Sequence, residues 1–202
     1  MAQILSPTPR DIWPPFTVNF KSIRLTPAQF EQLCSDNRDL RLELTFEGEL
    51  IVMPPAGSKT GLRNARLTQR LATWAETDET GVCFDSSTGF TLPNGSQYSP
   101  DSAWIGRARW DALTNEEQER FAPICPDFLI ELRSHSDSLS RLRNKMQEYI
   151  HNGARLAWLV DPLKRQVSIY RPDRDVEVID DPETVSGEPL LRGFILNLDE
   201  LW

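Results

Sequence analysis

Three side chains in this sequence could act together on a phosphate ester. Asp101 follows Pro100 where an alternating, strand-like segment becomes more apolar, and Glu131 lies inside the apolar run 128–132. A carboxylate inside a buried strand is costly unless an ion pair, hydrogen bonds or a metal ion satisfies it. Two acidic side chains at the ends of neighbouring strands could bind Mg2+, which prefers one or two carboxylates, keeps several waters and accepts phosphate oxygens. Taken alone, Asp101 is also typical of a turn.

The third side chain, Lys145, lies on the helix that is expected after Glu131. An apolar stripe follows one face of that helix, through Leu139, Leu142, Met146 and Ile150. At about 100° per residue, Lys145 falls at the border of this stripe, so its amine could reach round to the end of the Glu131 strand. The same spacing also fits an ordinary lysine at the flank of a helix.

The elements before Asp101 should position it through hairpins and helices. Thr26 followed by Pro27 predicts the start of a helix that continues to about residue 37. The alternation in segment 42–46 and the turn at Gly48 predict a β-hairpin with segment 50–53. Helical spacing predicts a second helix over about residues 60–77, and the pair Asn94-Gly95 predicts a further hairpin before Asp101.

The elements around Glu131 predict a strand, helix and strand crossover. A strand over 128–132 precedes a helix of about 14 residues, which the pair Asn152-Gly153 ends. Strands follow at residues 156–160, 167–170 and 176–179. A crossover of this kind makes part of the sheet parallel. The predicted fold class is therefore α/β, with a mixed sheet flanked by helices and an N-terminal hairpin.

Length and charge set limits on this fold. The chain has 202 residues and a net charge of -8, from 22 basic and 30 acidic residues. We expect an extended N-terminal arm over 1–24, where Pro7, Pro9, Pro14 and Pro15 lie. The rest of the chain, 25–202, should form a single domain, with a core over 25–172 and an acidic cap over 173–202. The near-average composition argues against disorder and coiled coil, and the acidic total argues against binding nucleic acid by bulk charge.

The chain has no pattern that predicts a membrane protein or a secreted protein. No stretch approaches the roughly 18–20 apolar residues that span a membrane, and the start lacks a basic leader with an apolar run. The three cysteines form no CxxC pair. We therefore expect free thiols and a cytoplasmic location.

The order of these motifs resembles the bacterial putative restriction endonuclease family, a domain-of-unknown-function family of the PD-(D/E)XK nuclease superfamily. The motifs are Ser99-Pro100-Asp101, Glu131-Leu132-Arg133-Ser134, Lys145 within segment 144–149, and Trp158-Leu159-Val160-Asp161-Pro162, preceded by Leu42-Glu43-Leu44 and Met53-Pro54-Pro55. The resemblance runs from about residue 25 to residue 172. It implies a restriction-endonuclease-like fold.

The resemblance implies roles for individual residues of this sequence. Asp101 matches the acidic residue of the PD element, and Glu131 matches the glutamate of the (D/E)XK strand. Arg133 departs from the pattern, because it stands where the superfamily has lysine; Lys145 occupies the place of a lysine on the following helix. An arginine cannot serve as a general base, since its pKa exceeds about 12.

Two further positions bear on the resemblance. Glu43 matches an upstream acidic position, with a role as a second metal ligand or an orienting residue; it also fits a solvent-facing strand glutamate. Thr60 stands where many family members have His after the Met-Pro-Pro turn. That departure implies weaker or differently arranged activity.

The leading hypothesis is a Mg2+-dependent endonuclease acting on DNA, with Mn2+ able to substitute. Asp101, Glu131 and the Leu132 carbonyl would hold the metal, which would polarise the scissile phosphate and acidify a water. Lys145 would stabilise phosphoryl charge, with Glu43 assisting. The expected contacts to substrate phosphate are Arg133 and Arg141. The alternatives are a catalytically inactive nuclease-fold module that binds nucleic acid or protein, and a hydrolase of a small phosphorylated substrate.

The distribution of charge along the chain indicates where DNA is expected to make contact. Residues 131–172 carry eight basic and four acidic residues, a local charge of +4. We therefore expect salt-sensitive DNA contact on the side formed by residues 131–171. Sequence-specific cutting by a single domain would need a homodimer, because a symmetric pair presents two active sites to two strands.

Overall fold

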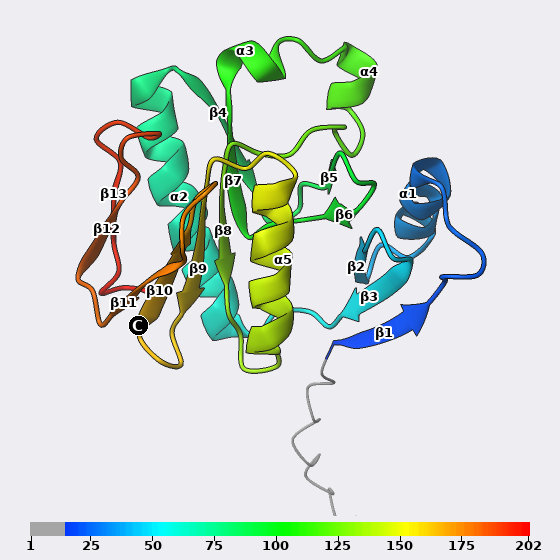
Figure 1. Cartoon of the computed structure of the whole chain (residues 1–202), viewed down its shortest axis with the longest axis horizontal. Coiled ribbons are helices and arrows are strands. Elements are labelled where there is room, and N and C mark those ends of the chain that lie inside the picture. The colour runs from blue at the N-terminus through cyan, green and yellow to red at the C-terminus, as the bar shows by residue number, and fades with distance from the viewer. Residues whose placement is uncertain (1–14) are drawn as a thin grey trace, which may run out of the picture.

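The computed structural model describes residues 15–202 (Figure 1). The part of the expected arm that contains Pro7, Pro9 and Pro14 lies outside the described residues. The helices are α1 (Pro27–Asp36), α2 (Ser58–Asp78), α3 (Arg107–Trp110), α4 (Asn115–Gln118) and α5 (Leu139–His151). None of the helices within residues 15–202 combines the length and the apolar character that a membrane-spanning helix requires.

A six-stranded sheet forms the centre of the molecule. Its strands lie in the order β11 (Glu177–Asp180), β10 (Gln166–Tyr170), β9 (Leu156–Asp161), β8 (Phe128–Leu132), β7 (Ser102–Gly106) and β4 (Gly81–Asp85). Strands β8 and β9 are parallel, with Glu131 opposite Leu159, and the other pairs are antiparallel. The predicted crossover through α5 and the predicted mixed sheet are therefore confirmed.

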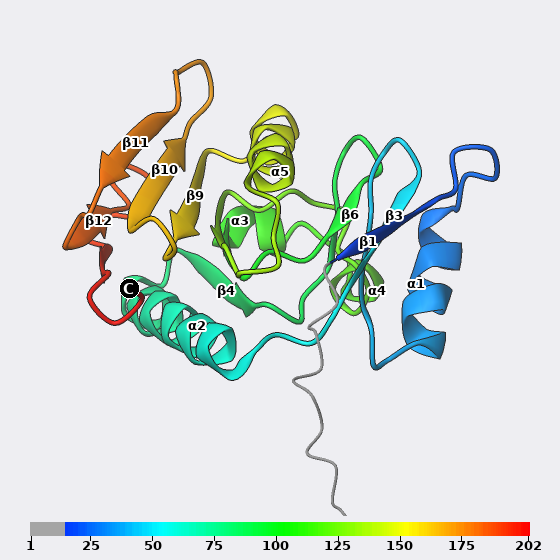
Figure 2. The same cartoon turned by 90° about the horizontal axis from the view of Figure 1, so that it is seen from below.

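Helices cover both faces of this main sheet, as Figure 2 shows for α2 and α5. Leu67 and Leu71 of α2 pack in one cluster with Phe128 and Ile130 of β8. The intervening β8 residue Leu129 packs in the cluster on the α5 side. Because both faces of β8 are buried, its sequence has no apolar and polar alternation, which is why Glu131 stands out within it.

A second sheet carries the N-terminal hairpin. Its order is β1 (Phe16–Asn19), β3 (Glu49–Met53), β2 (Arg41–Leu44), β6 (Gln97–Tyr98) and β5 (Phe90–Thr91). The β2–β3 and β5–β6 pairs confirm both predicted hairpins. The turn between β2 and β3 requires Gly48, whose φ is +82°.

The expected extended arm over 1–24 contains a regular element, the strand β1, which the sequence analysis did not predict. Strand β1 pairs with β3 over four residues, from Phe16 opposite Val52 to Asn19 opposite Glu49. The strand lies at the edge of the sheet and all four of its residues are exposed, so its sequence has no buried apolar face that would mark it. The helix α1 that follows starts as predicted, because Thr26 and Gln29 form a reciprocal capping box.

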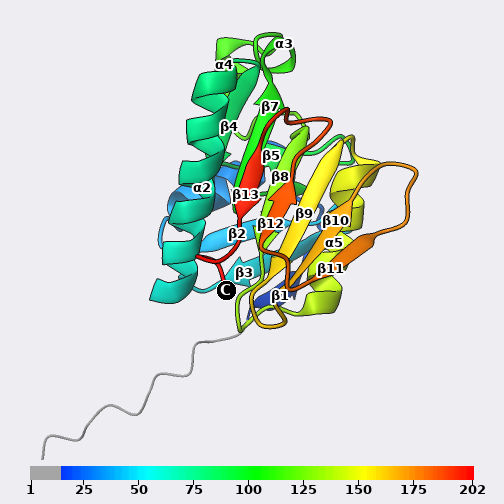
Figure 3. The same cartoon turned by 90° about the vertical axis from the view of Figure 1, so that its left-hand side faces the viewer.

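The acidic segment 173–202 contains a buried apolar layer as well as charge. Strand β11 extends the main sheet, and the hairpin of β12 (Thr184–Ser186) and β13 (Ile195–Asn197) lies over its α2 face (Figure 3). Val185, Phe194 and Leu196 pack into the same cluster as Trp158. The expected cap is therefore part of the main core on its inner side and acidic on its outer side.

Candidate functional site

Asp101 lies directly before β7 and is held by groups from three other elements. Its Oδ1 accepts a hydrogen bond from Asn64 Nδ2 of α2 at 2.7 Å, and its Oδ2 accepts one from the Leu132 N–H of β8 at 2.8 Å. Nη1 of Arg41 lies 3.9 Å from Oδ1. Burial raises the pKa of Asp101, while the Arg41 charge and the Leu132 N–H oppose that rise.

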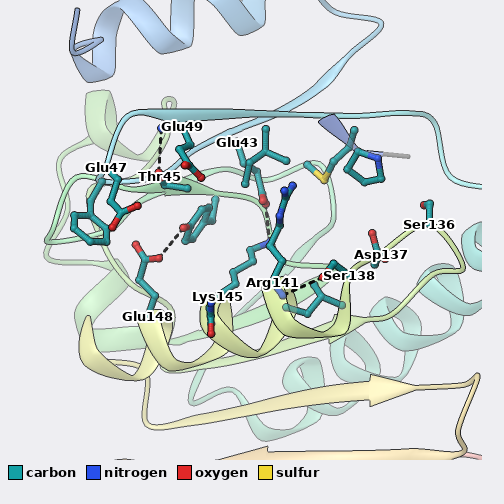
Figure 4. A pocket seen from close by; sticks show the side chains of 17 residues that line it. Glu43, Thr45, Glu47, Glu49, Ser136, Asp137, Ser138, Arg141, Lys145 and Glu148 are labelled. Carbon is teal, nitrogen blue, oxygen red and sulfur yellow. Dashed lines mark hydrogen bonds and ion pairs between the residues drawn. The ribbon is translucent and has the colours of Figure 1, made fainter. Parts of the chain in front are cut away.

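Glu131 and Glu43 share one buried ammonium group. Nζ of Lys145 lies 2.7 Å from Oε1 of each carboxylate, and Tyr149 OH donates to Glu131 Oε1 at 3.1 Å. The backbone N–H of Ser99 donates to Glu43 at 3.0 Å. Figure 4 shows Lys145 extending from α5 towards Glu43. The structure thus brings these three side chains into one cluster, and Glu43 is 3% exposed rather than solvent-facing.

The electrostatics of the cluster keep Lys145 charged. Burial alone would lower the pKa of Lys145, but Glu131 and Glu43 outweigh it and leave that pKa raised. Burial, together with the negative charges of Asp101 and Glu43, raises the pKa of Glu131 to about 8 against the opposing charge of Lys145. Three carboxylates lie beside two cations, Lys145 and Arg41, so negative charge is in excess when all three carboxylates are ionised.

The two arginines expected to contact phosphate lie in different places. Nη1 of Arg133 is 2.7 Å from Asp161 Oδ2 on the neighbouring strand, and Arg133 lines neither of the two cavities described below. Arg141 lines one of them together with Lys145. The structure therefore brings Arg141, but not Arg133, to the candidate site.

Two cavities flank the cluster. The Asp101 cavity, of about 570 Å3, is lined by Asp101, Glu131 and Leu132 and by residues of the loop that leads into α2. The Glu43 cavity, of about 410 Å3, lies between the N-terminal hairpin and α5 and is lined by Glu43 and Lys145. The cluster therefore borders accessible space on two sides.

The charges around these cavities differ. The other ionisable side chains of the Asp101 cavity are Arg41, Lys59, His135 and Asp137. The other charged side chains of the Glu43 cavity are Glu47, Glu49, Asp137, Arg141 and Glu148. Glu47, Glu49 and Glu148 surround the latter cavity in Figure 4. The Asp101 cavity is therefore the less acidic of the two.

The sequence analysis did not single out three residues of the site. Arg41 lies two residues before Glu43 on β2, so period-2 alternation could have placed both on the same face. Asn64 precedes Leu67 by three residues on α2, where a polar residue on the apolar face was the available signal. Lys59 gave no signal beyond its neighbour Thr60, which also lines the Asp101 cavity.

The basic segment 131–172 does not present its charge as one surface. Five of its eight basic side chains pair with carboxylates: Arg133 with Asp161, Lys145 with Glu43 and Glu131, Arg155 with Asp127, Arg165 with Asp181, and Arg171 with Glu177. Two of these partners, Asp181 and Glu177, come from the acidic segment that follows. The local +4 counted along the chain is thus partly neutralised in space.

The oxygen donors of the Asp101 cavity fit a hydrated Mg2+ or Mn2+ ion. Within residues 15–202, no group of three His, Cys, Asp or Glu side chains is arranged to hold a metal. Asp101 and Glu131 nevertheless line the same cavity and are within electrostatic reach of each other. Mg2+ commonly binds through one or two carboxylates and keeps its remaining waters, so this donor set is chemically suitable.

Comparison with known proteins identifies the family and the fold. The model of the family described as "Uma2: Putative restriction endonuclease" matches residues 27–199. The fold is similar to the crystal structure of a putative nuclease belonging to DUF820 from Anabaena variabilis, with a TM-score of 0.74, 21% identity, and 88% of this chain and 97% of that chain covered. This similarity confirms the predicted nuclease-like α/β fold.

Two other comparisons found little or no similarity. A chain of the DrdV–DNA complex is similar with a TM-score of 0.37 and 16% identity, over 60% of this chain and 10% of that chain, which is too little to compare sites. No curated protein sequence matches this chain.

Proposed function

We propose, from the premise that the chain belongs to the Uma2 family of putative restriction endonucleases, that it is a divalent-metal-dependent endonuclease that hydrolyses DNA phosphodiester bonds. Family membership supports a nuclease-type function. The observation that carries the finer proposal is the cluster in which Glu131 and Glu43 share the Lys145 ammonium beside Asp101, at the border of two cavities.

Asp101, Glu131 and the Leu132 carbonyl are the groups proposed to hold the metal. A bound Mg2+ ion would supply positive charge that polarises the scissile phosphate and makes a water molecule more acidic. Asn64 and the Leu132 N–H fix the orientation of the Asp101 carboxylate through hydrogen bonds to its two oxygens. The carboxylate is thus held in place before substrate binds.

Lys145 is proposed to stabilise negative charge on the phosphoryl group. Its pKa is raised by Glu131 and Glu43, so it remains an ammonium and acts through charge rather than as a proton acceptor. Glu43 holds this ammonium at 2.7 Å and is itself held by the Ser99 N–H. Its proposed role is therefore to position Lys145.

The DNA backbone is proposed to enter through the Asp101 cavity. Arg41 and Lys59 line that cavity and offer positive charge to phosphates next to the scissile one. The Glu43 cavity is unsuitable for a polyanion because of Glu47, Glu49 and Glu148. Arg41 and Lys59 thereby replace Arg133, whose guanidinium Asp161 already binds, as the proposed phosphate contacts.

A plasmid-nicking assay with Mg2+ tests the proposal. We expect Asp101→Asn and Glu131→Gln each to lower the nicking rate by a factor on the order of 100. Asp127→Asn is the matched control, because Asp127 is equally buried but lies at the opposite end of β8. Unchanged nicking in both site variants, with all proteins folded by circular dichroism, would exclude this active site.

One alternative is a nuclease-fold module that binds nucleic acid without cutting it. The pairing of Arg133 with Asp161 and the presence of Thr60 at the Asp101 cavity favour this alternative, because both positions depart from the family pattern. DNA binding in a gel-shift assay, together with no heat of Mg2+ binding and no nicking, would support it over the endonuclease.

The other alternative is a hydrolase of a small phosphorylated substrate. The volume of the Asp101 cavity, about 570 Å3, lies within the range of small-molecule sites and favours this alternative. Inhibition of a phosphodiesterase activity by nucleotides, with no effect of long DNA, would separate it from the endonuclease.

A further inference from the structure

Asn64 is a buried polar residue whose hydrogen bonding is incomplete. It lies on α2, on the face that also carries the buried Leu67 and Leu71, and is 8% exposed. Its Nδ2 donates to Asp101 Oδ1 at 2.7 Å, whereas its Oδ1 is buried and has no hydrogen-bond partner. The side chain lines the Asp101 cavity together with Asp101 and Glu131.

A buried carbonyl oxygen without a partner is unfavourable, so a group that satisfies it should belong to the working site. A hydrogen-bond donor would need to approach to about 2.7–3.2 Å. A divalent cation needs less room, since its oxygen ligands lie at about 2.0–2.1 Å for Mg2+. An amide carbonyl is also a hard oxygen ligand of the kind these ions prefer.

We propose that Asn64 Oδ1 is a third side-chain oxygen ligand of the divalent cation held by Asp101 and Glu131. This inference rests on the proposed function and extends its metal site onto α2. It also accounts for the missing third ligand among His, Cys, Asp and Glu side chains in the described part of the chain. The amide would serve two purposes, because its N–H orients the Asp101 carboxylate that binds the same ion.

The charge of the cluster favours a neutral third ligand. Asp101, Glu131 and Glu43 are buried close to one another, and Lys145 and Arg41 are the cations beside them. A fourth carboxylate at position 64 would add repulsion between like charges in the metal-free protein, whereas an amide supplies an oxygen without adding charge.

Binding of Mn2+ to the metal-free protein tests this inference without relying on activity. Isothermal titration calorimetry should show Asn64→Ala binding Mn2+ about tenfold more weakly than the wild type. Electron paramagnetic resonance in 17O-labelled water should count one more water on the Mn2+ bound to this variant. Asn64→Asp retains an oxygen at the position, so its water count should equal that of the wild type.

Gln97→Ala is the matched control for these measurements. Gln97 is also a buried side-chain amide without a hydrogen-bond partner, but it lines neither cavity. Its variant should bind Mn2+ as the wild type does, with the same water count. If Asn64→Ala fails to fold, Asn64→Ser and Asn64→Asp provide the same comparison, with Ser expected to gain the extra water.

The outcomes separate this inference from the proposed function. A wild type that binds Mn2+ and nicks DNA, with an unchanged water count in Asn64→Ala, would overturn the inference and leave the endonuclease intact. A wild type that neither binds Mn2+ nor nicks DNA would overturn both. Weaker binding with the gain of one water, in Asn64→Ala but not in Gln97→Ala, would support the inference.

Discussion

The two ends of strand β8 carry equally buried carboxylates in opposite electrostatic settings. Asp127, directly before the strand, is 2% exposed, and Glu131, near its other end, is 5% exposed. Nη1 of Arg109 lies 2.8 Å from Asp127, Arg155 lies 4.0 Å away, and the Gly106 N–H donates to it at 2.9 Å. Positive charge therefore exceeds negative charge around Asp127.

Around Glu131 the balance is reversed. Its one cationic partner, among the residues the structure describes, is Lys145, which Glu43 shares. Both carboxylates are buried, so burial alone does not distinguish a structural acid from one available for chemistry. The difference lies in how the negative charge is compensated. Two arginines and a backbone N–H compensate the charge of Asp127, whereas the Glu131 end retains negative charge that a further cation could balance.

Removal of Lys145 should give the largest effect on folding. Lys145→Met leaves Glu131 and Glu43 without their common partner, and we expect the free energy of unfolding to fall by about 3–5 kcal/mol. Urea denaturation in the presence of a chelator measures this loss. Lys164→Met, which removes an exposed lysine, should change stability by no more than about 0.5 kcal/mol. Equal losses of stability in the two variants would contradict the prediction that Lys145 is the common partner of the two buried glutamates.

The matched substitutions Asp127→Asn and Glu131→Gln should have different effects on the free energy of unfolding. Asp127→Asn weakens bonds to Arg109 and Gly106 and should lower the free energy of unfolding by about 2 kcal/mol. Glu131→Gln removes a charge from the crowded end and should leave that free energy unchanged or raise it by up to about 1 kcal/mol in the metal-free protein. Urea denaturation at pH 8 in the presence of a chelator measures both changes. Similar losses in both variants would show that the two ends are equivalent.

The sequence predicted those features of the fold and of the site that depend on local signals. Gly48 and the pair Asn94-Gly95 marked hairpins through their turns, and the apolar run with one acid marked β8 and Glu131. The helical stripe placed Lys145 at a border from which its amine does reach Glu131. Each of these predictions depends on residues close together along the chain.

The remaining parts depend on partners that are distant in the sequence. Nothing near Arg133 shows that Asp161 will bind it, and nothing near Asn64 shows that Asp101 lies 2.7 Å away. Asp127 was not singled out, because its two arginines lie 18 residues before it and 28 residues after it. Charge counted along the chain therefore overestimated the positive surface of residues 131–172.

Cys125 offers a smaller, local test of the same comparison. Burial raises the pKa of its thiol to about 12, with the Arg109 charge opposing, and its Sγ donates to the Tyr149 carbonyl at 3.5 Å. The thiol should therefore react slowly with iodoacetamide at pH 8, because little thiolate forms and the group is buried. It lies two residues from Asp127, so local opening of that end should control its labelling.

Asp127→Asn should accordingly increase the labelling rate of Cys125 several-fold, whereas Glu131→Gln should leave it unchanged. Mass spectrometry of the digested protein separates Cys125 from Cys34 and Cys83, all three of which are free thiols. If Cys125 is labelled as fast in the Glu131→Gln variant as in the Asp127→Asn variant, the two ends of β8 open together. The Asp127 end would then be no more rigid than the Glu131 end. Selective acceleration in Asp127→Asn would show that Asp127 and its arginines fasten one end of the strand independently of the charge left over at Glu131.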